Sequence, residues 1–191
     1  MIKTKSKDAQ YWEDRYRNDK TGWDMQQVSP PLKAYFDQIQ NKDSKILIPG
    51  CGNAYEAEYL IRQGFTDVHV LDIAIQPLIN LQIRVGETDR LHIHQADFFD
   101  FYDSFDLIIE QTFFCALHPD LRTAYSDKTN ELLNKNGQLV GLLFDFPLVS
   151  GPPYGGNISE YYAYFKPHFL FKTFQRAYNS YHKRFPKEIF I

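Results

Sequence analysis

The feature that most constrains the fold is a regular alternation of short apolar runs with amphipathic runs. Strands that alternate with helices along a chain predict a parallel sheet whose faces are covered by the connecting helices. The expected strands are residues 45–49, 67–73, 91–99, 105–111 and 137–146, and the expected helices between them are residues 54–63, 76–86 and 121–134. The sequence therefore predicts an α/β protein with a mainly parallel sheet.

Two further regions flank this alternation. The first 40 residues, which hold both tryptophans, precede the first strand and are interpreted as an appendage. The Pro/Gly-rich stretch 146–157 predicts a loop, followed by a short helix at 158–165 and closing strands within 168–179 and 187–191. A chain of 191 residues with 43% hydrophobic residues is long enough for one sizeable core. We therefore expect a single domain over 1–191, with 1–40 as the appendage and 41–191 as the α/β core.

Composition limits the partners. The formal charge of -3 gives no field that would gather nucleic acid or an anionic membrane. No run approaches the roughly 18 apolar residues that a membrane span needs, and the start of the chain lacks the apolar core of a secretory signal. The two cysteines form no CxxC pair, which suits a reducing compartment. We expect a cytoplasmic monomer that acts on a small molecule, with neither nucleic acid nor membrane as a partner.

The stretch SKILIPGCGNAYEAEYL places a glycine turn directly after the first expected strand. In a parallel sheet, ligands bind beyond the carboxyl ends of the central strands, and Gly50 and Gly52 allow a ligand to approach the backbone there. Asp72 follows at the end of the second strand, where a carboxylate accepts hydrogen bonds from ribose hydroxyls. An adenosine-containing ligand fits this pattern. Alternatively, the glycines only close a tight turn and Asp72 caps the next helix.

The end of the third strand carries Asp97 and Phe98. Asp97 is placed to accept from the exocyclic amino group of an adenine and Phe98 to cover its ring, although a capping Asp beside a core Phe is an alternative. A nicotinamide-dependent Rossmann oxidoreductase is a rival hypothesis for the glycine turn. The dinucleotide fingerprint requires a third glycine or alanine where this chain has Tyr55, which disfavours that rival.

Three successive strand ends carry, in order, the two glycines, Asp72 and Asp97. This arrangement resembles the cofactor site of the class I S-adenosylmethionine-dependent methyltransferases. Four segments then resemble the thiopurine S-methyltransferase family, and within it mostly the plant and microbial thiol and halide methyltransferases. They are YWEDRYRNDKTGWDMQQVSPPL, IPGCGNAYE, EQTFFCALHPDLRTAY and GPPYGG. The resemblance implies a Rossmann-like fold with a mainly parallel seven-stranded sheet, one antiparallel strand, helices on both faces and an N-terminal lid.

The same resemblance implies S-adenosylmethionine as the cofactor and S-adenosylhomocysteine as its product. It implies that the aromatic residues of the N-terminal segment fold over the active site, and that the strand-end residues hold the methionine, ribose and adenine parts. The implied cofactor-binding residues are Trp12, Tyr16, Trp23, Gly50, Gly52, Asp72, Asp97 and Phe98.

The acceptor side departs from the mammalian thiopurine enzymes. There, an arginine that contacts the aromatic acceptor follows an Asp at the end of the fourth strand, and here the pair is Glu110-Gln111. The neighbouring FFCAL fits the thiol and halide enzymes better, which favours a small sulfur nucleophile or a halide as the acceptor. We predict an acceptor pocket with Gln111, Phe114 and Tyr154, and Phe113 is a further candidate for its lining. Plain core packing remains the alternative for both Phe residues and the Tyr.

Methyl transfer from a sulfonium to a soft anion needs alignment and exclusion of water rather than a general base. The sequence accordingly needs no His-Asp or Cys-His constellation. The histidines have no metal-like spacing, and we expect no metal site, with His92 and His94 as a surface or sheet feature. A protein that binds the cofactor or its product without catalysis remains a further alternative.

Overall fold

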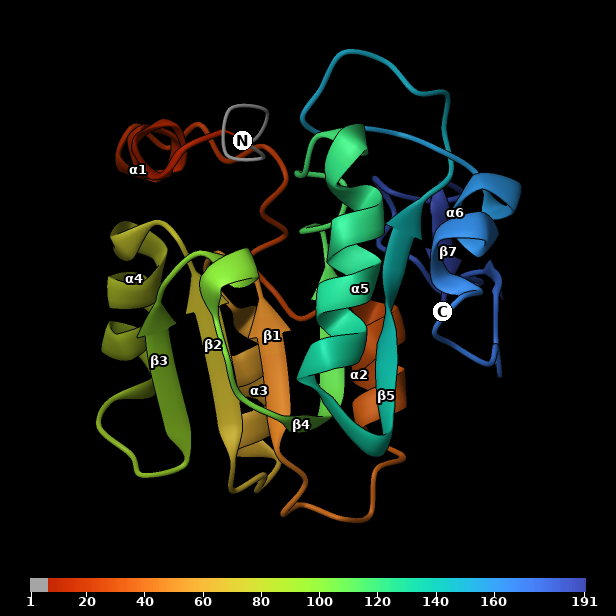
Figure 1. The fold of residues 1–191 in the computed structure, drawn as a ribbon. Coiled ribbons are helices and arrows are strands. Elements are labelled where there is room, and N and C mark those ends of the chain that lie inside the picture. Colours follow the sequence, from red (N-terminus) through yellow and green to blue (C-terminus); the bar gives the residue numbers. More distant parts are fainter. Residues whose placement is uncertain (1–6) are drawn as a thin grey trace.

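The computed structural model of the chain describes residues 7–191 and contains, within them, one seven-stranded mixed sheet (Figure 1). The strands are β1 (Ile46–Pro49), β2 (Val68–Asp72), β3 (Leu91–Gln95), β4 (Phe105–Gln111), β5 (Leu133–Phe144), β6 (Gln175–Arg176) and β7 (Glu188–Phe190). Their order across the sheet is β3-β2-β1-β4-β5-β7-β6. Strands β1 to β5 pair in parallel, and β7 is antiparallel to both of its neighbours. The predicted sheet with one antiparallel strand is confirmed.

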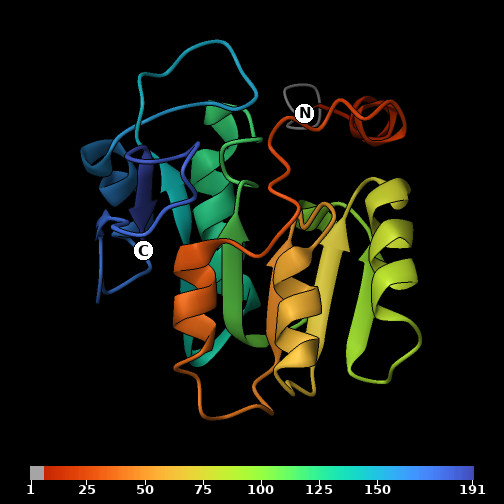
Figure 2. The same cartoon turned by 180° about the vertical axis from the view of Figure 1, so that it is seen from behind.

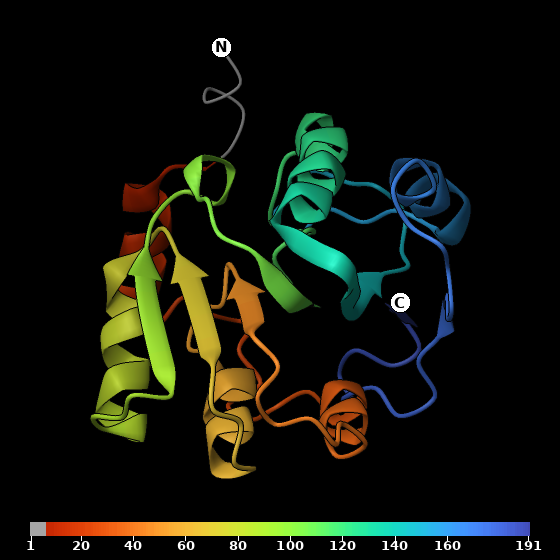
Figure 3. The same cartoon turned by 60° about the horizontal axis from the view of Figure 1, so that its bottom comes forward.

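Helices cover both faces of the sheet, as expected. The α-helices are α1 (Ala9–Arg17), α2 (Pro30–Phe36), α3 (Tyr55–Arg62), α4 (Ile75–Val85), α5 (Arg122–Leu132) and α6 (Ile158–Phe165), and the 3-10 turns are η1 (Phe98–Asp100) and η2 (Pro119–Leu121). Figures 2 and 3 show α2, α3 and α4 on one face, and α5 and α6 on the other. No helix of the described residues is long and apolar enough to cross a membrane.

The sheet separates two apolar cores because successive strand residues point to opposite faces. In β1, Ile46 and Ile48 pack with α2, α3 and α4, while Leu47 packs in the other core with residues of α5 and α6. All four β1 residues are buried, as expected for a central strand covered on both sides. The apolar run that the sequence places there therefore fixes the middle of the sheet.

The structure differs from the expected elements mainly near the two ends of the chain. The appendage contains α1 and α2, which the sequence interpretation did not place. The closing strand expected within 168–179 is reduced to β6, because Phe169, Phe171 and Phe174 pack their rings against the core instead of alternating across a sheet. Aromatic content alone made this segment resemble a strand.

The strand order reverses at β1 and β4, since the chain runs outward from β1 through β2 to β3 and then returns to β4 on the other side of β1. The carboxyl ends of these two central strands carry Gly50 and Gln111. This is the crevice in which doubly wound sheets bind their ligands. In Figure 1, α1 lies beyond the same end of the sheet.

Candidate cofactor and acceptor site

A cavity of about 1210 Å³ lies at the carboxyl ends of the central strands. Four parts of the chain line it: the N-terminal segment that includes α1, the loops after β1 to β4 with the start of α5, the end of β5 with the loop that follows it, and the C-terminal segment around residues 181–187. Of the eleven residues predicted for the site, nine are on its wall, namely Trp12, Tyr16, Trp23, Gly50, Gly52, Asp72, Asp97, Phe98 and Gln111. The sequence pattern thus identified groups that the fold brings to one cavity.

The loop after β1 takes a left-handed backbone at every second residue. Gly50 has φ +54°, Gly52 has φ +53° and Ala54, which begins α3, has φ +52°. A Cβ atom on Gly50 would collide with the ring of Phe113, and one on Gly52 would collide with the hydroxyl of Tyr16. Both glycines are therefore required by the backbone and by close neighbours within the chain itself.

Asp72 joins this loop to the next one. Its Oδ2 accepts a hydrogen bond from the backbone N–H of Gly52 at 2.8 Å, and its Oδ1 accepts one from the backbone N–H of Ala74 at 2.9 Å. Burial raises the pKa of Asp72, and these N–H donors oppose that rise. Each carboxylate oxygen has a second lone pair, so Asp72 is able to bind a ligand hydroxyl as well as holding the turn. The two interpretations of Asp72 are compatible.

Asp97 and Phe98 also combine local structure with a place on the cavity wall. Asp97 Oδ1 accepts from the N–H of Phe99 at 2.9 Å and so caps η1. Phe98 is almost fully buried, with its ring stacked on Tyr125 at 5.4 Å between centroids and edge-on to Phe113 at 5.3 Å. A capped turn thus presents a carboxylate and an aromatic ring at the end of β3.

The N-terminal segment contributes three aromatic residues that contact one another. The ring of Trp23 meets Trp12 at 5.6 Å and Tyr16 at 5.8 Å, both edge to face. Burial raises the pKa of Tyr16 strongly, with a further contribution from Asp72, so its hydroxyl stays protonated. These rings form a wall of the cavity opposite the strand ends.

Glu13 fixes α1 to the rest of the molecule. Its Oε2 accepts from the backbone N–H groups of Ile75 and Gln76, both at 3.0 Å, at the start of α4. The first N–H groups of a helix have no partner within the helix, and a carboxylate there also interacts favourably with the helix dipole. The sequence interpretation missed Glu13, because nothing in the pattern shows which helix a distant carboxylate caps.

The three residues predicted for the acceptor pocket lie in different places. Gln111 lines the cavity at 8% exposure, and neither its amide oxygen nor its amide nitrogen has a hydrogen-bond partner among the described residues. Phe114 lies in the core, with its ring edge-on to Tyr125 at 5.1 Å and to Tyr161 at 5.4 Å. Tyr154 packs against His118 at 5.6 Å, outside the cavity wall. Phe113 faces the cavity in place of its neighbour, because the turn after β4 rotates successive side chains to different sides.

Glu110, which the sequence interpretation did not place in the site, organises that turn. Its Oε1 accepts from the N–H groups of Phe113 and Phe114 at 2.8 and 2.9 Å, and its Oε2 accepts from the hydroxyl of Tyr125 at 2.6 Å. Complete burial raises the pKa of Glu110 to about 7. Thr112, at φ +60°, lies in the turn that these bonds hold.

The C-terminal segment brings cations to the cavity. Arg184 is buried, donates from Nη2 to the carbonyl of Trp23 at 2.5 Å, and lies 3.3 Å from Glu188 Oε1. Lys183 and Lys187 flank it and also line the cavity. Sequence reasoning considered only a cation after β4 and missed these residues, because more than 70 positions separate them from Gln111 in the chain.

Solved structures define the class of fold first. A Burkholderia thailandensis 1,6-didemethyltoxoflavin-N1-methyltransferase with bound S-adenosylhomocysteine superposes with a TM-score of 0.77 at 17% identity, covering 95% of this chain and 84% of that one. A TehB-like S-adenosylmethionine-dependent methyltransferase from Corynebacterium glutamicum gives 0.67 at 17% identity, with 95% of each chain covered. The fold is that of the class I methyltransferases.

Sequence comparison then gives the family. The model of the thiopurine S-methyltransferase family matches residues 7–188, so the chain belongs to that family. A probable thiol methyltransferase 2 from Arabidopsis thaliana is 30% identical, over 78% of this chain and 69% of its own length. Thiocyanate methyltransferase 1 from the same plant is 27% identical, over 78% and 68%, and a Vibrio parahaemolyticus thiopurine S-methyltransferase is 23% identical, over 81% and 80%. This chain is an S-adenosylmethionine-dependent methyltransferase.

The donor set of the cavity fits that cofactor. Asp72 offers spare carboxylate lone pairs beside the glycine turn, and Phe98 with Asp97 offers a flat apolar surface with an acceptor at its edge. The cavity also exceeds the roughly 300–1,000 Å³ typical of small-molecule sites, which leaves space for an acceptor beside a cofactor.

Proposed function

We propose that the protein transfers a methyl group to a small sulfur nucleophile, such as a thiolate, hydrosulfide or thiocyanate, or to a halide. The observation that carries this proposal is the amide of Gln111, which is buried in the cavity wall with both polar atoms unpartnered among residues 7–191. A buried polar group without a partner is costly, so such a group at a ligand site favours a ligand that completes its hydrogen bonding. The N–H₂ of Gln111 is the donor we assign to the anionic acceptor.

The surroundings of Gln111 support an anion of small size. Phe113, Cys115 and Leu117 of the following turn line the same part of the cavity, and burial raises the pKa of the Cys115 thiol so that it stays neutral. Arg184 and its neighbouring lysines also line the cavity and contribute positive potential to it. The names of the two Arabidopsis relatives, a thiol and a thiocyanate methyltransferase, agree with this choice.

We further propose that Trp12, Tyr16, Trp23, Gly50, Gly52, Asp72, Asp97 and Phe98 hold the cofactor. When bound, S-adenosylmethionine supplies an electrophilic methyl group on a sulfonium, with a neutral thioether as leaving group. The chain then has to align the acceptor with that methyl and exclude water from it, which are large contributions for a soft anionic nucleophile. No general base is needed, and the neutral thiols and phenols of the wall suit that requirement.

The domain organisation belongs to the same proposal. We assign residues 1–191 to one domain with 1–40 as its N-terminal segment and 41–191 as its α/β core. Within that segment α2 packs against β1 in the core, so the lid is the part before α2. Residues 1–6 lie outside the described part. Two sets of hydrogen bonds would hold the lid closed. The backbone N–H groups at the start of α4 donate to Glu13, and Arg184 donates to the carbonyl of Trp23. The formal charge of -3 argues against a nucleic-acid partner, and we further propose a cytoplasmic monomer.

Headspace gas chromatography tests the acceptor. Purified protein is incubated with S-adenosylmethionine and, in separate vials, iodide, thiocyanate or hydrosulfide, with a thiopurine as a fourth acceptor followed by liquid chromatography. We expect enzyme-dependent volatile methylated products and little thiopurine product. Calorimetry with S-adenosylhomocysteine accompanies the assay, and Asp72→Asn serves as a variant in which cofactor binding is weakened.

The outcomes are distinct. Binding of S-adenosylhomocysteine without any volatile product rejects the small acceptor and directs the search to larger thiols. Product from the thiopurine alone also rejects it. Tighter binding of a nicotinamide dinucleotide than of S-adenosylhomocysteine would reject the cofactor assignment itself.

A further inference from the structure

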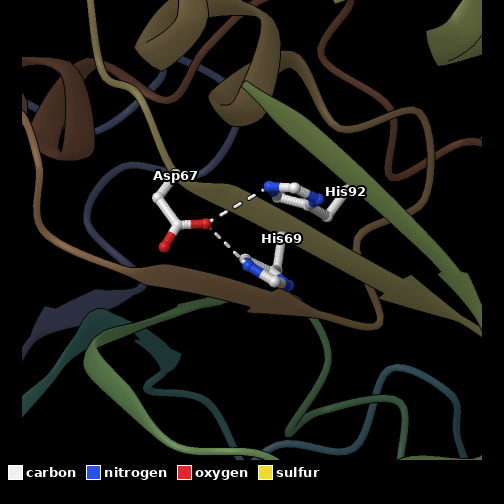
Figure 4. A group of neighbouring side chains, drawn as sticks. All are labelled: Asp67, His69 and His92. Atoms are coloured by element: carbon white, nitrogen blue, oxygen red, sulfur yellow. Dashed lines mark hydrogen bonds and ion pairs between the residues drawn. The ribbon is translucent and has the colours of Figure 1, made fainter. Parts of the chain in front are cut away.

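Three imidazoles and a carboxylate gather at the other end of β2, away from the cavity. Asp67 precedes β2, His69 lies on β2, and His92 is its direct partner on β3 in the parallel register. Figure 4 shows Asp67 beside the two rings, with Oδ1 at 2.8 Å from His69 Nε2 and 3.3 Å from His92 Nε2. His94 lies two residues further along β3, and its Nε2 is 2.9 Å from Nδ1 of His69.

These side chains lie on a part of the sheet that no α-helix of the described chain covers. Figure 1 shows α5 in front of β4 and β5, whereas only η1 and the chain that leads from it to β4 pass in front of β2, and no α-helix lies in front of the edge strand β3. The connection from β3 to β4 contains only the short turn η1. The imidazoles share this face with Phe101 and Phe105, and the rings of His69 and His92 are stacked at 4.4 Å.

We propose that Asp67, His69 and His92 form a binding site for a divalent first-row metal ion of the zinc or cobalt type. Their three ligand atoms all lie within 4.8 Å of one another. In a tetrahedral site with bonds of about 2.0–2.1 Å, ligand atoms are separated by about 3.3 Å. The spacing between Asp67 and His92 already has that value, and the spacing between Asp67 and His69 needs to lengthen by about 0.5 Å.

The chemistry of the donor set selects the class of metal. Two imidazole nitrogens and one carboxylate oxygen suit zinc, cobalt or copper better than calcium or magnesium, which prefer oxygen ligands. Three protein ligands leave one tetrahedral position for water. His92 and Asp67 are 42% and 35% exposed in their side chains, so the ion has a route from solvent.

His94 completes the arrangement as a positioning residue. With Nε2 of His69 bound to the metal, the proton of that ring resides on Nδ1 and is donated to Nε2 of His94. The nearby cation Lys45 is paired with Asp103 at 2.7 Å, which offsets its repulsion of the ion. A metal-binding histidine whose second nitrogen is hydrogen-bonded is the usual pattern in protein metal sites.

The site is separate from the methyl-transfer site. Asp67 and Asp72 lie at opposite ends of β2, about 16 Å apart at the rise of a parallel strand. The metal would therefore cross-link β2 to the edge strand β3 and raise the melting temperature, with no part in methyl transfer. The sequence interpretation expected no metal site, because His92 and His94 carry no metal-like spacing and their partners come from a different strand.

Titration with Co²⁺, followed by its visible absorption, tests the proposal on the full-length protein. We expect one tetrahedral Co²⁺ per chain and a rise in melting temperature with Zn²⁺. His92→Gln and Asp67→Asn should each weaken Co²⁺ binding by more than about tenfold, since even changes outside the ligand shell cost 10–100-fold. His94→Gln should weaken binding while it leaves the tetrahedral spectrum intact, which a merely structural role would not produce.

The matched control is His168→Gln. His168 Nε2 is 2.7 Å from Asp127 Oδ1, so this exposed pair has the same residue types without a second imidazole at bonding distance in the described chain. We expect its Co²⁺ binding to equal that of the wild type. Unchanged binding in both His92→Gln and Asp67→Asn, or no binding by the wild type, would overturn the proposal. A thiolate charge-transfer band would also overturn it by moving the metal to Cys51 or Cys115.

Discussion

The two walls of the cavity are built in different ways. On the cofactor wall, Asp72 already accepts two backbone hydrogen bonds, and the glycine turn beside it is fixed by left-handed dihedrals. On the acceptor wall, the amide of Gln111 has no partner among the described residues, and the carboxylate that orders its turn, Glu110, lies behind it in the core. The cofactor wall is complete without a ligand, whereas the acceptor wall has a polar group to satisfy.

This difference indicates how the two specificities arise. Under the proposed assignment, a common cofactor would be bound by a preorganised turn, which costs little reorganisation on binding. An acceptor would then be selected by side chains of the turn after β4 and of the C-terminal segment. Changes on the cofactor wall should therefore affect cofactor binding first, and changes on the acceptor wall should affect the acceptor alone.

The largest expected effect tests Glu110 behind the acceptor wall. Burial raises its pKa from 4.5 to about 7, so the folded protein holds this proton more tightly than the unfolded chain. The resulting stability is fully present below about pH 4.5 and is lost as pH rises through about 7. Glu110→Gln cannot lose a proton there. Relative to the wild type, the free energy of unfolding of Glu110→Gln should therefore increase by on the order of 3 kcal/mol between pH 4.5 and pH 8.

Urea denaturation at a series of pH values measures this difference. The control is the exposed Glu87→Gln, whose stability should follow the wild type at every pH. Parallel curves for Glu110→Gln and wild type would mean that Glu110 is ionised throughout, and the turn would then rest on a buried charge.

The next effect tests the cofactor wall. Asp72→Ala removes the acceptor for Gly52 and Ala74 and the proposed ribose contact. We expect affinity for S-adenosylhomocysteine to fall by about 1–3 kcal/mol, or roughly 5- to 150-fold. Isothermal titration calorimetry measures it. Asp89→Ala on the exposed surface is the control, and an affinity for Asp72→Ala equal to that of Asp89→Ala would reject the ribose role.

The site residues that the sequence predicted differ from those that it missed in how they reach the cavity. Gly50 follows an apolar strand, Asp72 ends the next strand, and Asp97 lies two residues after the third. Their places at the strand ends, and hence on the cavity wall, were therefore predictable from the local alternation of strands and helices. Arg184 and Glu13 reach the site through long-range packing that no local pattern encodes. The motifs offered Phe113, Phe114 and Tyr154 for the acceptor pocket without separating them. The turn after β4 directs Phe113 to the cavity and Phe114 into the core, and Tyr154 lies against His118.

A smaller effect distinguishes the role of the acceptor wall from that of the cofactor wall within one variant. Gln111→Leu replaces the unpartnered amide with an apolar group of similar size and removes the proposed donor to the acceptor. We expect KM for thiocyanate or iodide to rise about tenfold, the order of one hydrogen bond to a charged group. The affinity for S-adenosylhomocysteine should stay unchanged, which makes it the internal control. Equal losses in both quantities would show that Gln111 serves the cofactor instead.

The smallest effect concerns the lid that both walls share. Glu13→Gln keeps an oxygen that is able to accept from Ile75 and Gln76 but removes the charge at the start of α4, which is worth about 0.3–1 kcal/mol. S-adenosylhomocysteine should then bind less than about fivefold more weakly, and the amides of α1 should exchange faster with deuterium. Asp14→Asn, on the exposed side of α1, is the matched control. Faster exchange in α1 with unchanged affinity would mean that the cofactor wall holds its ligand without the N-terminal aromatic residues, and would assign the lid to the acceptor wall alone.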